Sequence, residues 1–134
     1  MTTELNYLVC TAILTTILWV PVVVGYLKCR GMLKPEDYKR LPEGGLDAWV
    51  VRANRAHVNA VENFAPFAAV VLVAHVADIH SSLTVFCAAA FFYLRLAHAI
   101  VFIAGISVLM LRTVLFALSF TTFLVYAIAV LMSA

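Results

Sequence analysis

Four side chains that could bind a charged ligand recur along one segment of an otherwise apolar stretch. They are Arg52, Arg55, Asn59 and Glu62, at successive spacings of 3, 4 and 3 residues. On an α-helix, these spacings place them within a sector of about 80°. Guanidinium groups bind anions through paired hydrogen bonds, and a carboxylate binds an ammonium group. The stripe therefore predicts a site for a ligand with both kinds of charge.

A second polar pair lies in a later apolar stretch, where Arg95 and His98 are three residues apart on one helix face. Arg95 is far from the polar ends of that stretch. An unpaired guanidinium deep in a membrane costs about 2.5–3.5 kcal/mol on insertion scales, so it usually faces a partner or a cavity. We expect Glu62 to be the partner of Arg95.

Two interpretations of these charges are open. In the first, Arg52 and Arg55 anchor the helix at the lipid headgroups, and Glu62 and Arg95 form an interhelical clamp. In the second, the arginines surround a ligand pocket. A clamp would balance its charges, whereas Arg112 adds a fourth arginine to a cluster with a single glutamate. The positive excess favours a pocket for an anionic ligand.

Composition indicates that a membrane protein positions these residues. Of the 134 residues, 65% are hydrophobic and 12% are charged, against about 45–50% and about 25% in soluble domains. Four apolar stretches are long enough to cross a hydrocarbon core of about 30 Å. They are approximately Leu5 to Leu27, Trp49 to Ala77, Leu83 to Ala104, and Arg112 to Met132. We expect an all-α, four-helix transmembrane bundle that forms one domain over residues 1–134.

The connections predict the topology. Residues 28–47 form a long polar loop, residues 78–82 a tight turn, and residues 105–111 a short apolar loop. Basic residues lie in or beside the first and third connections: Lys28, Arg30, Lys34, Lys39, Arg40 and Arg112. The positive-inside rule places these two loops in the cytosol and both termini outside it.

Other binding classes have little support. The formal charge of +2 and the lack of a basic run with interleaved aromatic residues do not indicate a nucleic-acid partner. The three cysteines and four histidines have no convincing metal-ligand spacing, so we expect no metal site. His57 falls off the polar stripe, and we interpret it as a helix-packing residue.

Residues 52–67, RANRAHVNAVENFAPF, resemble the signature of the MAPEG family, the membrane-associated proteins of eicosanoid and glutathione metabolism. LRLAH at 94–98 and LRTV at 111–114 are similar to motifs in the family's third and fourth helices. The resemblance implies a homotrimeric helical bundle that binds glutathione between subunits near the cytosolic face.

The same resemblance implies roles for particular residues. Arg55, Asn59 and Glu62 would line the glutathione site with Arg52 nearby, and Arg95 and His98 would contribute from the third helix. Arg112 and Thr113 match the arginine–hydroxyl pair beside the glutathione sulfur. A basic residue at the end of the first helix, either Lys28 or Arg30, would also take part.

The implied function is a membrane-bound transferase or peroxidase. It would use glutathione as co-substrate and attack lipophilic electrophiles from the bilayer through the glutathione thiolate. Because the sequence shows no long sorting extension, we expect a bacterial inner membrane, with an organellar membrane as the alternative. Phe102 occupies a position where many members have a tyrosine, so no phenol can donate to the sulfur. A non-catalytic glutathione- or lipid-binding scaffold is therefore the alternative. A small four-helix multidrug transporter, in which an intramembrane glutamate binds cations, is disfavoured because arginines outnumber Glu62.

Overall fold

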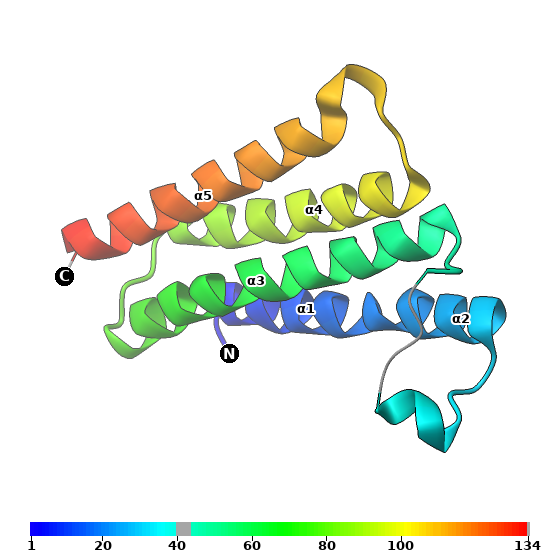
Figure 1. Cartoon of the computed structure of the whole chain (residues 1–134). Coiled ribbons are helices and arrows are strands. Elements are labelled where there is room, and N and C mark those ends of the chain that lie inside the picture. The colour runs from blue at the N-terminus through cyan, green and yellow to red at the C-terminus, as the bar shows by residue number, and fades with distance from the viewer. Residues whose placement is uncertain (40–43, 134) are drawn as a thin grey trace.

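The structure, a computed structural model, describes residues 1–39 and 44–133 (Figure 1). Within these residues every regular element is a helix. The elements are α1 (Thr3–Ile17), α2 (Trp19–Arg30), η1 (Pro35–Tyr38), α3 (Ala48–Val76), α4 (Ser82–Ala104), η2 (Val108–Met110) and α5 (Leu111–Ser133). Four helical segments in this part of the chain are long and apolar enough to cross a membrane: Thr3–Arg30, Ala48–Val76, Ser82–Ala104 and Val108–Ser133. The predicted four-helix transmembrane fold is confirmed.

The first membrane-spanning segment is divided at Leu18, between α1 and α2. Pro21 explains the break. A proline has no backbone N–H, so the carbonyl of Ile17, four residues earlier, loses its usual helical donor. Leu18 keeps a helical backbone conformation, with φ −62° and ψ −16°. The two helices therefore continue along nearly one line (Figure 1).

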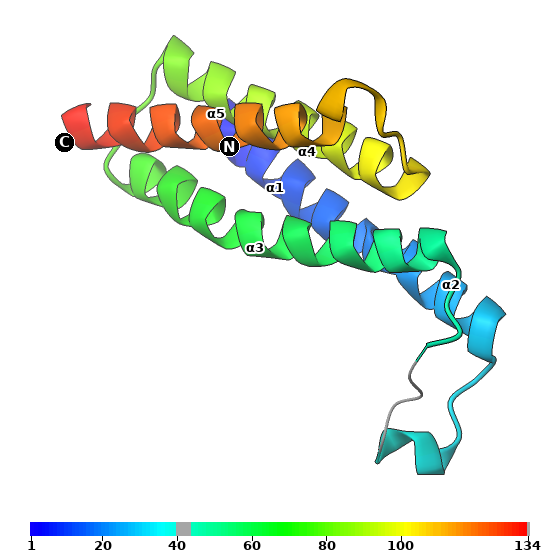
Figure 2. The same cartoon turned by 45° about the horizontal axis from the view of Figure 1, so that its top comes forward.

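The bundle has two chemically different ends. Both termini and the turn between α3 and α4 lie at one end, here called the terminal end; the first loop and η2 lie at the other, here called the loop end (Figure 1). Figure 2 shows η1 projecting away from the membrane-spanning helices at the loop end. The expected basic loops thus share one side, although Arg40 lies outside the described residues.

The apolar core is concentrated towards the terminal end. There the rings of Phe67 and Phe91 stack with centroids 4.0 Å apart, and Tyr126 meets Phe67 edge-on at 6.5 Å. Towards the loop end a smaller apolar cluster consists of Leu18, Ala60 and Ala99. The separation between α4 and α5 also widens towards that end (Figure 1). The divergence of α4 and α5 opens the bundle at the loop end (Figure 1).

A buried polar cluster joins the helices at the terminal end. Glu4 in α1 is only 3% exposed, and its Oε1 accepts a 2.7 Å hydrogen bond from the Thr84 hydroxyl in α4. His80 Nδ1 lies 3.3 Å from the same oxygen. Thr84 and Ser81 also cap the start of α4 reciprocally. These contacts fix the start of α1 against the start of α4.

Candidate functional site

Two adjoining hollows open at the loop end, between α3, the end of α4 and the start of α5. The larger is a cavity of about 330 Å³, lined by Arg52, Val101, Phe102, Gly105, Ile106, Ser107, Met110, Arg112 and Thr113. The smaller, of about 290 Å³, is lined by Arg55, Asn59, His98, Phe102, Arg112, Thr113 and Phe116. Phe102, Arg112 and Thr113 line both. The two hollows therefore share one wall.

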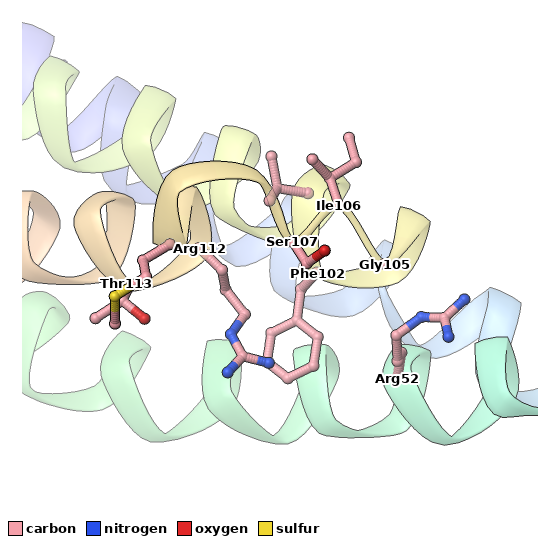
Figure 3. Close-up of a pocket in the computed structure, with 9 residues that line it drawn as sticks. Arg52, Phe102, Gly105, Ile106, Ser107, Arg112 and Thr113 are labelled. Atoms are coloured by element: carbon pink, nitrogen blue, oxygen red, sulfur yellow. The ribbon is translucent and has the colours of Figure 1, made fainter.

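Arg112 and Phe102 form the centre of the shared wall. The guanidinium carbon of Arg112 lies 4.6 Å from the centroid of the Phe102 ring, and Figure 3 shows the two side chains together. A cation at this distance is attracted by the negative face of an aromatic ring. His98 meets the same ring edge-on, with centroids 5.6 Å apart. Phe102 thus orients Arg112 without offering a hydrogen-bond donor.

Arg52 binds the end of α4 and lines the larger hollow. Its Nε donates a 3.1 Å hydrogen bond to the carbonyl of Ile103. The last carbonyls of a helix have no partner within the helix and carry its negative dipole, so a guanidinium is favourable there. Gly105 caps α4 with φ 72°, and a Cβ at this position would lie 2.9 Å from Arg52 Cζ. The glycine allows both the left-handed cap and the close approach of Arg52.

Arg95 has a different partner from the one expected. It is 4% exposed, and its Nη2 donates to the side-chain oxygen of Asn59 at 2.7 Å and to the Asn59 carbonyl at 3.1 Å. Glu62 is exposed, and no ion pair joins it to Arg95 in the described chain. The predicted Glu62–Arg95 pair is therefore wrong. The side chains of Asn59 and Glu62 leave α3 in directions about 60° apart. Asn59 contacts Arg95 of α4, whereas Glu62 is exposed.

The charge of the hollows has one sign. Three arginines contribute to their walls: Arg52, Arg55 and Arg112. No carboxylate belongs to either wall among residues 1–39 and 44–133. A surplus of guanidinium groups in a recess surrounded by apolar helices favours an anionic occupant.

The sequence as a whole decides the family. Residues 6–132 match the model of the MAPEG family. The chain belongs to the MAPEG family. A search of curated proteins found no match. MAPEG members include glutathione transferases, glutathione-dependent peroxidases and non-catalytic proteins, so membership does not by itself select an activity.

The MAPEG motif residues are brought together only in part. The residues that line a hollow are Arg52, Arg55, Asn59, His98, Arg112 and Thr113. Arg95 lies behind Asn59 rather than in a wall, and Glu62 lines neither hollow. The two candidates at the end of the first span also lie outside both walls. The guanidinium carbon of Arg30 instead lies 5.3 Å from the centroid of the Tyr26 ring, and its Nη2 donates a hydrogen bond to the Gly44 carbonyl.

Two further observations concern residues outside the arginine stripe. His57 Nδ1 lies 3.2 Å from the Thr15 carbonyl, which confirms its expected role in helix contact. The apolar walls contributed by Ile106, Met110 and Phe116 were not anticipated. The MAPEG motifs give no signal for them, because an apolar side chain facing a hollow and one facing lipid look alike in sequence.

Proposed function

We propose that this protein is a membrane-bound glutathione-dependent transferase or peroxidase that acts on lipophilic electrophiles. The observation that carries the proposal is the Arg112–Thr113 pair in the wall shared by the two hollows. It supports a reaction in which a ligand in one hollow meets a ligand in the other beside a fixed positive charge.

Glutathione fits the charge of the smaller hollow. The tripeptide has two carboxylates, one ammonium group and a thiol. Arg55 and Asn59, both in the wall of that hollow, would bind a carboxylate, and the sulfur would lie beside Arg112. His98 adds a ring nitrogen that can donate or accept within the same wall.

Glu62 lines neither hollow of its own protomer. It would bind the ammonium group of a glutathione held in the hollow of a neighbouring protomer. Its carboxylate is exposed on the outer side of α3, where a neighbouring subunit would approach. We propose a homotrimer, as the MAPEG resemblance implies, in which Glu62 completes a site between subunits. The ligand would then lie in the hollow of one protomer and bind Glu62 of the partner subunit through its ammonium group.

Arg112 would supply the chemistry by stabilising the thiolate. A free thiol has a pKa of about 8.5 and is mostly protonated at neutral pH. A nearby permanent cation lowers such a pKa by roughly 1–3 units, and the Thr113 hydroxyl can donate a hydrogen bond to the anion. The thiol proton passes to water. The sulfur then forms a bond to an electrophilic carbon, and the leaving group departs with its electron pair.

The loop end would face the cytosol. Four described basic residues of the first connection lie there, namely Lys28, Arg30, Lys34 and Lys39. We therefore propose an orientation with both termini outside the cytosol. A C-terminal alkaline phosphatase fusion would be active and a C-terminal green fluorescent protein fusion dark. The reverse pair of signals would contradict the orientation.

Calorimetric titration of the detergent-purified protein with glutathione tests the proposal. We expect binding by the wild type and about tenfold weaker binding by Arg55→Ala, equivalent to about 1.4 kcal/mol. Lys39→Ala, which removes an exposed loop charge, should bind like the wild type. Turnover would then be assayed with a chloronitrobenzene acceptor and a lipid hydroperoxide. No heat of binding would refute the glutathione site.

Binding without turnover of any electrophile would favour the non-catalytic alternative. Phe102 is the observation that supports this alternative, because its ring contacts Arg112 but cannot donate a hydrogen bond to a thiolate. In that case the protein would be a glutathione- or lipid-binding scaffold of the same family.

A further inference from the structure

The end of α4 is closed only in part by its own backbone. The Ile106 amide donates to the Val101 carbonyl at 3.1 Å, and the Gly105 amide donates to the Phe102 carbonyl at 3.2 Å. These two bonds form the motif in which a helix ends at a left-handed glycine. The last carbonyls of a helix have no donor within the helix, and the motif leaves the Ile103 carbonyl to another partner.

Arg52 of α3 is that partner. Its Nε donates a 3.1 Å hydrogen bond to the Ile103 carbonyl. Its guanidinium also lies against Gly105, because a Cβ on the glycine would be 2.9 Å from Arg52 Cζ, 3.0 Å from Nε and 3.2 Å from Nη2. A hydrogen bond and a close packing contact thus hold the guanidinium in place. The same two contacts tie the end of α4 to α3.

This connection reaches Arg112 through Phe102. Ile103 directly follows Phe102 in the last turn of α4, and the guanidinium carbon of Arg112 lies 4.6 Å from the centroid of the Phe102 ring. In Figure 3 the Arg112 guanidinium lies over that ring, and Arg52 extends from α3 towards Gly105. A displacement of the last turn of α4 would therefore move the ring that orients Arg112.

We propose that Arg52 is a positioning residue, which holds the last turn of α4 so that Phe102 keeps Arg112 beside the glutathione sulfur. The inference rests on the proposed function and assigns Arg52 a role towards Arg112 rather than towards the ligand. The competing role is purely electrostatic. In that role Arg52 would act through its charge in the wall of the larger hollow, and its hydrogen bond to Ile103 would not matter.

Three substitutions of Arg52 separate its hydrogen bond from its charge. Glutamine has its Nε2 at the same chain position as the arginine Nε, so Arg52→Gln keeps the donor and removes the charge. Lysine has a methylene at that position, so Arg52→Lys keeps the charge and loses the Nε donor. Methionine has a methyl group there, and Arg52→Met loses both. Val51→Met, at an exposed position outside both walls, is the matched control.

Two measurements follow Arg112 in these proteins. The first is the NMR signal of its Nε–Hε group, recorded in detergent with isotope-labelled arginine and assigned by its loss in Arg112→Lys. The ring current of Phe102 shifts this signal, so it reports the contact between the two side chains without any ligand. The second is the ultraviolet absorbance of the glutathione thiolate, titrated against pH, which reports how well Arg112 stabilises the anion.

We expect Arg52→Met and Arg52→Lys to move the Arg112 signal away from its ring-shifted position. They should also raise the midpoint of thiolate formation by about 0.5 pH unit, a part of the roughly 1–3 units that a nearby cation contributes. Arg52→Gln should restore both measurements to the wild-type values, and Val51→Met should change neither. If Arg52→Met does not fold, lysine and glutamine still give opposite results for the two roles.

An unchanged Arg112 signal in the methionine and lysine variants would overturn the proposal. So would a thiolate midpoint that is normal with lysine and raised with glutamine, because the charge of Arg52 would then decide. A wild type that binds no glutathione would refute the proposed function instead. In that protein a shifted Arg112 signal with lysine, restored with glutamine, would still support the positioning of Arg112 by Arg52.

Discussion

Arg95 donates two hydrogen bonds from one nitrogen to Asn59, at 2.7 Å to the side-chain oxygen and 3.1 Å to the backbone carbonyl. The contact joins the middle of α4 to the polar stripe of α3. Arg95 Nη1 is buried and has no partner in the described structure. Asn59 in turn lines the smaller hollow. Arg95 therefore holds the side-chain oxygen of Asn59, a residue in the wall of that hollow.

Loss of the Asn59 side chain should destabilise the fold. Asn59→Leu removes the 2.7 Å hydrogen bond from Arg95 and leaves the buried Arg95 guanidinium with one acceptor fewer. The loss should lower the free energy of unfolding by about 1.5–3 kcal/mol. We expect the midpoint of thermal unfolding in detergent to fall by several degrees. A second substitution, Arg95→Met, should recover part of the loss, because it removes the unsatisfied charge. An unchanged midpoint for Asn59→Leu would show that the contact contributes little.

Helical periodicity predicted the four spans and the polar stripe, but it could not select the partner of Arg95. Glu62 and Asn59 lie on the same broad face of α3, and charge alone favours Glu62. The position of α4 decides in favour of Asn59, and that position depends on packing between distant parts of the chain. The contact of Glu4 with Thr84, 80 residues apart, is another example. Neither residue belongs to a periodic polar pattern.

Arg112 should control ionisation of the bound thiol. Replacement by methionine keeps an unbranched side chain and removes the charge, so the thiol pKa should return towards about 8.5. Ultraviolet absorbance of the thiolate, titrated against pH in the presence of glutathione, measures this change. Lys34→Met, in the exposed first loop, is the matched control. An identical titration curve for Arg112→Met would remove Arg112 from this role.

Phe102 should affect the reaction by orienting Arg112. Phe102→Leu removes a cation–π contact worth about 0.5–2 kcal/mol, so thiolate formation should decrease while Arg55-dependent glutathione binding is retained. Phe102→Tyr keeps the ring and adds a phenol, so thiolate formation should rise above the wild type. The same absorbance titration compares the three proteins. Equal thiolate fractions for phenylalanine and leucine would contradict an orienting role.

The polar cluster at the terminal end should contribute to stability without affecting the site. Thr84→Val removes a hydrogen bond to the buried Glu4 carboxylate, at a cost of about 1–3 kcal/mol. The thermal midpoint should fall, whereas glutathione affinity should be unchanged, because the cluster lies at the opposite end of the bundle (Figure 1). Val76→Ala, at an exposed position of the same end, is the control. A matching loss of glutathione affinity would show that the two ends are coupled.

Gly105 should be constrained both by its backbone and by Arg52. Alanine at φ 72° would cost about 1–2 kcal/mol from left-handed strain alone, and its Cβ would also displace the guanidinium that lies 2.9 Å away. A double-mutant cycle separates the two effects. Gly105→Ala should lower the thermal midpoint more in the wild type than in an Arg52→Ala background, where strain is the only remaining cost. Equal decreases in both backgrounds would mean that Arg52 adjusts freely and that the glycine is needed only for its conformation.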